Sequence, residues 1–164
     1  MNPEFLSIDD VVRIHQDQIE RYGGAPELRN AGLLASAVEV AQASVAGSWL
    51  HTDLFEMASA YLFHIVQNHP FLDGNKRTGT AAALVFLDIN GVEIEASDDE
   101  LYELVMNVAS GGATKPEIAD FLRSARIVRN SAHTRSSREQ APSSHAPPPV
   151  CDPNHRCRRR ATAR

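Results

Sequence analysis

Residues 68–80 read Asn68-His69-Pro70-Phe71-Leu72-Asp73-Gly74-Asn75-Lys76-Arg77-Thr78-Gly79-Thr80. This stretch separates two helical patterns of apolar residues, and it gathers a histidine, a carboxylate, amides and two cations that no hydrophobic core requires. Pro70 restricts His69 to an extended or turn geometry, which predicts that the incoming helix ends there. Gly74 permits a tight turn, and the next helix is expected to begin near Asn75 with free backbone N–H groups. The stretch therefore predicts two helices joined by a turn, with an anion site at the start of the second helix.

Capping signals place further helices before this stretch. Ser7 is expected to cap a first helix, which the glycines at positions 23–24 terminate. Asn30 is expected to cap a second helix, and residues 43–51 are expected to form a loop or a short hairpin. Asp53 is expected to cap a third helix that is apolar on most sides, which predicts that this helix is central and buried.

Similar signals follow the stretch. A fourth helix leaves it and is expected to pack against the third as the core pair, and residues 92–95 alternate in polarity, which is typical of a short extended segment. Ser97 begins a capping box for a fifth helix, and Thr114 begins another for a last helix that is expected to end near Arg126 or Val128. The pattern predicts an all-α domain of about six helices.

Charge divides the chain into two parts. Residues 1–128 hold 8 Lys and Arg against 19 Asp and Glu, a net charge of −11, whereas residues 129–164 hold 8 Arg against 2 acidic residues, a net charge of +6. We therefore expect one domain over residues 1–128 and a disordered tail rich in Arg, Ser and Pro over residues 129–164. The acidic domain argues against direct binding of nucleic acid.

Several classes of protein are disfavoured by the remaining composition. No window approaches the roughly 18 apolar residues of a membrane span, and the N-terminus does not resemble a secretory signal. Both cysteines, Cys151 and Cys157, lie in the tail, so the domain has no disulfide framework. A cytoplasmic protein with no membrane partner is the expectation.

The stretch resembles the core motif of the Fic superfamily, which reads His-Pro-Phe-x-x-Gly-Asn-Gly-Arg-x-x-Arg. It is more similar to the death-on-curing (Doc) branch, which reads His-x-Phe-x-Asp-Gly/Ala-Asn-Lys-Arg-Thr. Lys76 stands where nucleotidyl-transferring Fic enzymes carry glycine, and Thr80 stands where they carry a second arginine. The segments at residues 21–24 and 28–34 also look like the Doc N-terminal half, so the resemblance covers about residues 5–126. It implies a Fic/Doc-type helical bundle with a short flap.

The resemblance implies roles that suit the chemistry of these residues. His69 resembles the general base that removes a proton from a target hydroxyl, and an imidazole has a suitable pKa near about 6.5. Its structural alternative is a turn histidine that caps the preceding helix. Asp73 resembles a ligand for Mg²⁺ that bridges nucleotide phosphates, and a structural role as a helix N-cap carboxylate is compatible with this one. The anion-binding turn would consist of Gly74, Asn75, Lys76 and Arg77. Phe71 looks like the apolar anchor of the loop.

Lys76 bears on which phosphoryl group is transferred. A glycine here, with the later arginine, makes room for a deep triphosphate in AMP-transferring Fic enzymes, whereas a lysine fills part of that space. The resemblance to Doc therefore implies a protein kinase that uses ATP and Mg²⁺, whose family target is a threonine of elongation factor Tu. It implies the toxin of a type II toxin–antitoxin system, which blocks translation in the bacterial cytoplasm. Its partner would be a Phd-like antitoxin that binds through a C-terminal helical segment.

Two other readings of the motif stay open. The chain could be an adenylyltransferase that adds AMP to a protein hydroxyl, or a non-catalytic module that only binds the antitoxin. Thr52 and Glu56 form the nearest match to the inhibitory segment of self-restrained Fic proteins, but Met57 breaks the pattern. We expect inhibition by a separate protein for this reason. His15 lies within the first predicted helix, where a lone histidine is more often structural or exposed than catalytic. His64 lies within the third, where we expect a satisfied core or rim histidine and not a ligand.

Overall fold

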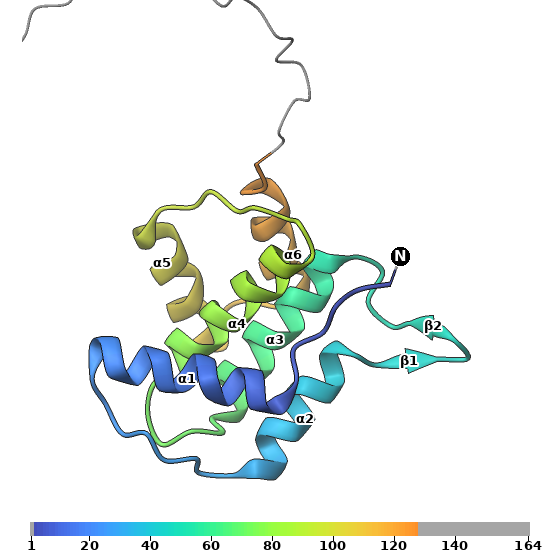
Figure 1. Ribbon diagram of the computed structural model, residues 1–164. Coiled ribbons are helices and arrows are strands. Elements are labelled where there is room, and N and C mark those ends of the chain that lie inside the picture. Colours follow the sequence, from blue (N-terminus) through green and yellow to red (C-terminus); the bar gives the residue numbers. More distant parts are fainter. Residues whose placement is uncertain (1, 128–164) are drawn as a thin grey trace, which may run out of the picture. The chain divides into compact units, whose positions relative to one another are not determined.

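The computed structural model describes residues 2–127, which form six helices and one short antiparallel hairpin (Figure 1). The all-α fold with a hairpin flap is therefore confirmed for this part of the chain. The expected tail at residues 129–164 lies outside the described residues. Helix starts follow local capping bonds, and helix packing follows the apolar faces that the sequence provides.

Helices α1 (Ile8–Tyr22) and α2 (Ala31–Ala41) begin where the capping residues predict. Ser7 accepts a hydrogen bond from the backbone N–H of Asp10, and the Asp10 carboxylate accepts one from the N–H of Ser7. This reciprocal capping box satisfies two N–H groups that the first turn of a helix leaves open. Asn30 caps α2 by accepting from the N–H of Leu33 at 3.1 Å. Both starts confirm the sequence prediction.

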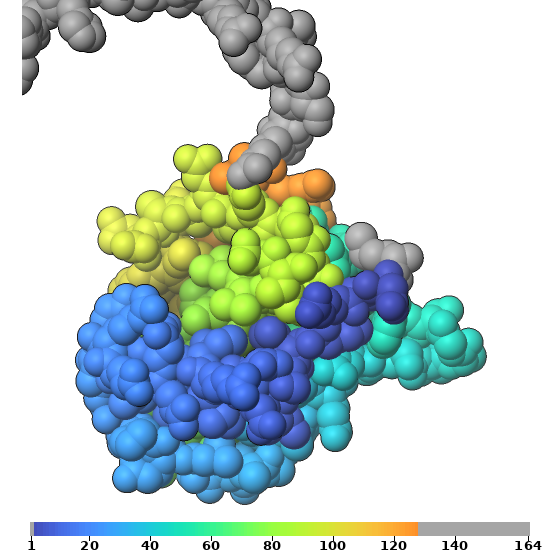
Figure 2. Space-filling model, viewed as in Figure 1, coloured from blue at the N-terminus to red at the C-terminus, as the bar shows by residue number. Residues whose placement is uncertain are grey.

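A two-stranded hairpin follows α2 and extends away from the helices (Figure 1). Strands β1 (Ser44–Val45) and β2 (Ser48–Trp49) pair antiparallel, and the connecting residues Ala46 and Gly47 both have positive φ, at 52° and 82°. Two positive φ angles are typical of the tight turns that join β-hairpins. Figure 2 shows the N-terminal residues lying over the helices beside this hairpin, and Phe5 contacts Trp49 with ring centroids 4.9 Å apart.

Helix α3 (Leu54–Asn68) is the most buried element, and α4 (Asn75–Ile89) packs against it. Gly79 makes close packing possible, because a Cβ at this position would lie 2.9 Å from Val66 Cγ2 and 3.1 Å from the carbonyl oxygen of Leu62. Tyr61 and Phe86 join the two helices further along, with ring centroids 5.3 Å apart. The predicted core pair is therefore confirmed. The packing of α3 on α4 fixes both ends of the turn that connects them.

Helices α5 (Asp98–Ala109) and α6 (Lys115–Ser124) begin at capping boxes led by Ser97 and Thr114, as predicted. The end of α6 is two residues or more short of the expected Arg126 or Val128. Residues 125–127 instead pair with the extended segment at 93–95, since Glu95 N–H donates to Ala125 and Ile127 N–H donates to Glu93. These long-range bonds compete with the last helical turn, which explains the earlier end.

One hydrophobic core connects all six helices, with Tyr61, Phe71 and Phe86 among its largest buried side chains. None of the helices within residues 2–127 has the length and apolar character that a membrane crossing requires. The core leaves the turn between α3 and α4 at the surface, and this turn carries the predicted site.

Candidate active site

The turn between α3 and α4 is held in place by the segment that precedes α2. The two segments run side by side, with an antiparallel bridge between Leu28 and Phe71 (Figure 1). Leu72 N–H donates to the carbonyl of Glu27 at 3.1 Å, and Arg29 N–H donates to the carbonyl of Pro70 at 2.8 Å. Phe71 is only 2% exposed, so it anchors the turn in the core as predicted.

His69 ends α3 and faces solvent at the edge of a cleft. The helix stops there as expected, but the backbone is left-handed, with φ 48° and ψ 57°, and not extended. Pro70 disfavours the right-handed helical conformation at His69, and the left-handed one is a common way to end a helix. A left-handed conformation is uncommon and mildly strained for a residue other than glycine. Its imidazole has no hydrogen-bond partner within residues 2–127.

Asp73 and Gly74 form the start of α4. Gly74, at φ 77°, is the N-cap residue and provides no side-chain cap, so the expected N-cap role of Asp73 is wrong. The Asp73 Oδ1 accepts the N–H of Gly74 at 2.6 Å, and its Oδ2 lies 3.7 Å from Nη2 of Arg77. The Asp73 side chain is 54% exposed, which leaves oxygen lone pairs available to a cation in the cleft.

The first turn of α4 presents backbone donors toward the cleft. The first intrahelical bond runs from Thr78 N–H to the carbonyl of Gly74 at 2.9 Å, so the N–H groups of residues 75–77 have no carbonyl partner in the helix. The side chain of Asn75 is not available to a ligand, because it accepts from Phe71 N–H at 2.9 Å and donates to Phe71 C=O at 2.8 Å. Asn75 therefore contributes a backbone donor, and its amide braces the turn.

The two cations of the turn differ in how they are held. Arg77 donates to the backbone carbonyls of Gln18, at 3.3 Å, and Gly23, at 3.0 Å. Lys76 is exposed, and within residues 2–127 the one polar contact of its ammonium is the sulfur of Met106, 3.5 Å from Nζ. Arg77 is fixed by α1, whereas Lys76 is free to reach an anion.

Thr80, one turn after Lys76, contributes no donor to this anion site. Its hydroxyl donates to the carbonyl of Lys76 at 2.9 Å and is thereby turned back onto α4. The position that carries a second arginine in the Fic motif therefore holds a short, internally bonded side chain.

A cleft of about 880 Å³ connects this polar turn with α5. Its polar end is lined by His69, Asp73, Gly74, Asn75, Lys76 and Arg77, so the structure brings all the predicted site residues together. Its other wall is mostly apolar and comes from Leu84 on α4 and from Leu101, Tyr102, Val105 and Met106 on α5, with the carboxylate of Asp98 at the start of α5 as its charged member. Ligand sites commonly have roughly 300–1,000 Å³ and combine apolar walls with a few polar groups. The polar end, with its open N–H groups and cations, is compatible with an anionic group, and the apolar wall is compatible with a less polar part of the same ligand.

Asp73 is compatible with a magnesium site that a substrate completes. Among the residues described, no group of three or more His, Cys, Asp or Glu side chains could hold a metal ion. Magnesium is often bound by one or two carboxylates together with substrate phosphates and water. The exposed carboxylate of Asp73, next to the open N–H groups of α4, fits that arrangement.

His15, on α1, contacts the turn in a way that the sequence did not indicate. It is 1% exposed, and its ring stacks on Phe71 with centroids 3.8 Å apart. Its Nε2 lies 3.0 Å from the carbonyl oxygen of Asp73. Burial lowers the pKa of His15, although the bond to the Asp73 carbonyl opposes this effect. The spacing of four residues from the buried Val11 was a signal of burial, but not of the partner.

The sequence of this chain matches a known family and two named relatives. The sequence model of the Fic/DOC family matches residues 5–87, which span α1 through most of α4. The chain is 37% identical over 118 residues to the protein kinase doc of Escherichia phage P1, covering 72% of this chain and 92% of the relative. It is 41% identical over 96 residues to the toxin Doc of Mycolicibacterium smegmatis, strain ATCC 700084 / mc(2)155, covering 58% of this chain and 72% of the relative.

Proposed function

The chain belongs to the Doc toxin family within the Fic/Doc superfamily, and we propose that it is a toxin that acts as a protein kinase in a toxin–antitoxin system. It transfers the γ-phosphoryl group of ATP to a hydroxyl of a target protein. The kinase named among its relatives and the layout of the cleft support this proposal together. Within the cleft, Lys76 and Thr80 carry the argument.

Lys76 and Thr80 favour transfer of the γ-phosphoryl group over transfer of AMP. The ammonium of Lys76 is exposed at the start of α4, where it occupies space that a glycine would leave for the triphosphate. The hydroxyl of Thr80 is bonded to the carbonyl of Lys76, so this position offers no cation for a deeply bound γ-phosphate. ATP would then bind with its terminal phosphate toward His69 and its base away from it.

The reaction uses three parts of the turn. The imidazole of His69 takes the proton of the target hydroxyl, the hydroxyl oxygen forms a bond to the γ-phosphorus, and ADP leaves with the electrons of the broken bond. The backbone N–H groups of residues 75–77, with Lys76 and Arg77, hold the phosphate oxygens through charge-assisted hydrogen bonds. Asp73 would hold Mg²⁺, which neutralises charge on the phosphates when it is bound.

A separate antitoxin is the proposed means of control. The nearest match to an internal inhibitory segment contains Glu56, whose carboxylate accepts the N–H of Thr52 at the N-terminal end of α3, away from His69. We propose a Phd-like antitoxin whose C-terminal segment forms a helix on the toxin. The proposed target is a threonine of elongation factor Tu, and the proposed site of action is the bacterial cytoplasm.

Transfer of label from ATP tests the proposed reaction. The purified chain is incubated with Mg²⁺ and elongation factor Tu, with γ-labelled ATP in one arm and α-labelled ATP in the other. We expect label on the target from the γ-position only, and none when EDTA is present or when His69 is replaced by Ala. Label from the α-position would show an adenylyltransferase. The non-catalytic module would be favoured if folded protein that binds the antitoxin produced no label in either arm. The same result would have to hold in a whole-cell extract.

A further inference from the structure

His15 is a buried polar residue that the proposed reaction does not use directly. It lies on the inner face of α1, one turn after Val11, and both side chains are almost fully buried. A buried polar group is unfavourable unless it forms a hydrogen bond. The imidazole forms one to the protein, and its ring is nearly parallel to that of Phe71, with an interplanar angle of 5°. The ring is therefore positioned by two contacts, and both are to the turn between α3 and α4.

The hydrogen bond of His15 reaches the residue that would bind the metal. Nε2 lies 3.0 Å from the carbonyl oxygen of Asp73, which is 58 positions away in sequence. A carbonyl can only accept, so Nε2 carries the hydrogen and donates it. The next residue, Gly74, has φ 77°, and a Cβ built on it would lie 3.5 Å from Nε2. His15 therefore contacts the turn at the peptide that sets the direction of the Asp73 side chain.

The end of α1 limits the same carboxylate from another direction. A Cβ at Gly24 would overlap Oδ2 of Asp73 and would lie 3.2 Å from Nη2 of Arg77. Arg77 is itself held by the carbonyls of Gln18 and Gly23. The backbone of Asp73 is thus held by His15, and its carboxylate lies between Arg77 and Gly24.

We propose that His15 is a positioning residue, which orients the carboxylate of Asp73 for Mg²⁺ by donating a hydrogen bond to the Asp73 carbonyl. The inference rests on the proposed function for the role of Asp73. Groups that orient a metal ligand typically affect metal affinity by about 10- to 100-fold when they are removed. Loss of the donor should therefore weaken the metal-dependent part of nucleotide binding and leave the metal-independent part unchanged.

Three substitutions separate the donor from the ring. His15→Phe keeps a ring on Phe71 but has no donor. His15→Gln places an amide nitrogen close to the position of Nε2, whereas the shorter His15→Asn does not reach it. Val11→Ala is the matched control, because it removes buried volume from the same face of α1 without removing a hydrogen-bond donor. Thermal unfolding of all four variants measures the structural contribution of each side chain.

Calorimetric titration with ATP, with and without Mg²⁺, gives the metal-dependent affinity of each variant, and steady-state assays give kcat and KM. We expect His15→Phe and His15→Asn to weaken ATP binding at least tenfold with Mg²⁺ present, with little change in its absence. His15→Gln should recover most of this loss, and Val11→Ala should lower the melting temperature only. If His15→Phe does not fold, the comparison of Gln with Asn decides the question.

The positioning role would be overturned if Mg²⁺ strengthened ATP binding equally in His15→Gln and His15→Asn, while Asp73→Ala no longer responded to Mg²⁺. The kinase proposal would stay intact in that case. A wild-type chain that binds ATP with Mg²⁺ but transfers no γ-phosphoryl group would overturn the kinase proposal. The metal-dependent affinities would still decide the role of His15 in that case.

Discussion

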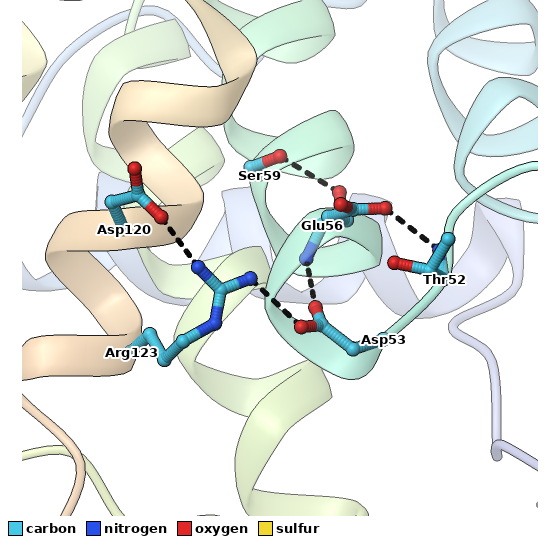
Figure 3. A network of polar contacts seen from close by, with 6 residues as sticks. All are labelled: Thr52, Asp53, Glu56, Ser59, Asp120 and Arg123. Atoms are coloured by element: carbon cyan, nitrogen blue, oxygen red, sulfur yellow. Dashed lines mark hydrogen bonds and ion pairs between the residues drawn. The ribbon is translucent and has the colours of Figure 1, made fainter.

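At the N-terminal end of α3, polar side chains bond to one another, whereas at its C-terminal end several have no strong partner in the described chain. Figure 3 shows the first of these ends. The Asp53 carboxylate accepts the N–H of Glu56 at 2.9 Å and forms an ion pair with Nη2 of Arg123 at 2.7 Å. Arg123 also pairs with Asp120. The carboxylate of Glu56 accepts the N–H of Thr52 at 2.7 Å. This network connects the start of α3 to α6.

The C-terminal end of α3 has the opposite arrangement. The imidazole of His69 has no hydrogen-bond partner within residues 2–127, and the ammonium of Lys76 has only a methionine sulfur as a polar partner there. The N–H groups in the first turn of α4 are also open. Polar groups that bond within the protein stabilise the fold, whereas groups left open at a cleft are available to a ligand. Substitutions at the first end should therefore change stability, and substitutions at the second end should change activity.

The largest effect is expected from His69→Ala, at the C-terminal end of α3. Loss of a general base typically lowers the rate by about 10²–10⁴-fold. The side chain is exposed and has no partner in the described part, so thermal unfolding should change little. Measurement of kcat for γ-phosphoryl transfer, together with growth of cells that express the variant, checks this. A folded variant that still arrests growth would remove His69 from the proposed mechanism.

The next effect is expected from Lys76→Gly, at the same end. Loss of a charge-assisted contact should lower γ-phosphoryl transfer by about tenfold or more. The freed space should permit a low level of AMP transfer, short of a full switch because Thr80 is not an arginine. Parallel assays with γ- and α-labelled ATP measure both activities, with Lys76→Arg as the control that keeps the charge. Unchanged γ-transfer in the glycine variant would show that Lys76 does not set the orientation of ATP.

Local signals in the sequence were sufficient to predict most of the fold and the members of the candidate site. Ser7, Asn30 and Ser97 each cap a helix through bonds to residues three positions away, so neighbours in sequence determine those helix starts. The site residues lie within nine positions of one another, so one turn brings them together.

Contacts between distant parts of the chain could not be predicted in this way. His15 meets Asp73 only because α1 packs on α4, and Gly24 approaches Asp73 for the same reason. The early end of α6 depends on pairing with residues 93–95. The left-handed conformation of His69 could not be predicted from Pro70 alone, because a following proline disfavours only the right-handed helical conformation.

A smaller effect is expected from Asp53→Ala, at the N-terminal end of α3. Loss of an N-cap typically costs about 1 kcal/mol of the free energy of unfolding. Asp53→Asn is the matched control, since asparagine also caps helices but does not pair with Arg123 through a charge. Both ion-pair side chains are partly exposed, so we expect the asparagine variant to lose much less stability. Urea denaturation measures both, and kcat should be unchanged. A lower kcat in a fully folded alanine variant would contradict the separation of the two ends.

The smallest effect concerns His64, which lies within α3 between the two ends. Its Nε2 is buried and has no partner in the described part of the chain, so the expectation of a satisfied histidine is not met. Burial lowers the pKa of His64, and the charges of Lys115 and His51 add to this effect. An unfolded histidine binds its proton near pH 6.5. The folded chain binds it only at lower pH, so the unfolded state holds more protons below pH 6.5 and the free energy of unfolding falls there.

Urea denaturation at a series of pH values from 7.5 to about 5 tests this sign. The wild-type chain should be less stable at the acidic end, and His64→Gln, which cannot be protonated, should lose less stability over the same range. Some pH dependence should remain in the variant, because burial also lowers the pKa of His15. Identical slopes for wild type and variant would show that His64 does not resist protonation in the folded state. A loss of stability on acidification that is larger in His64→Gln than in the wild-type chain would contradict the sign for His64.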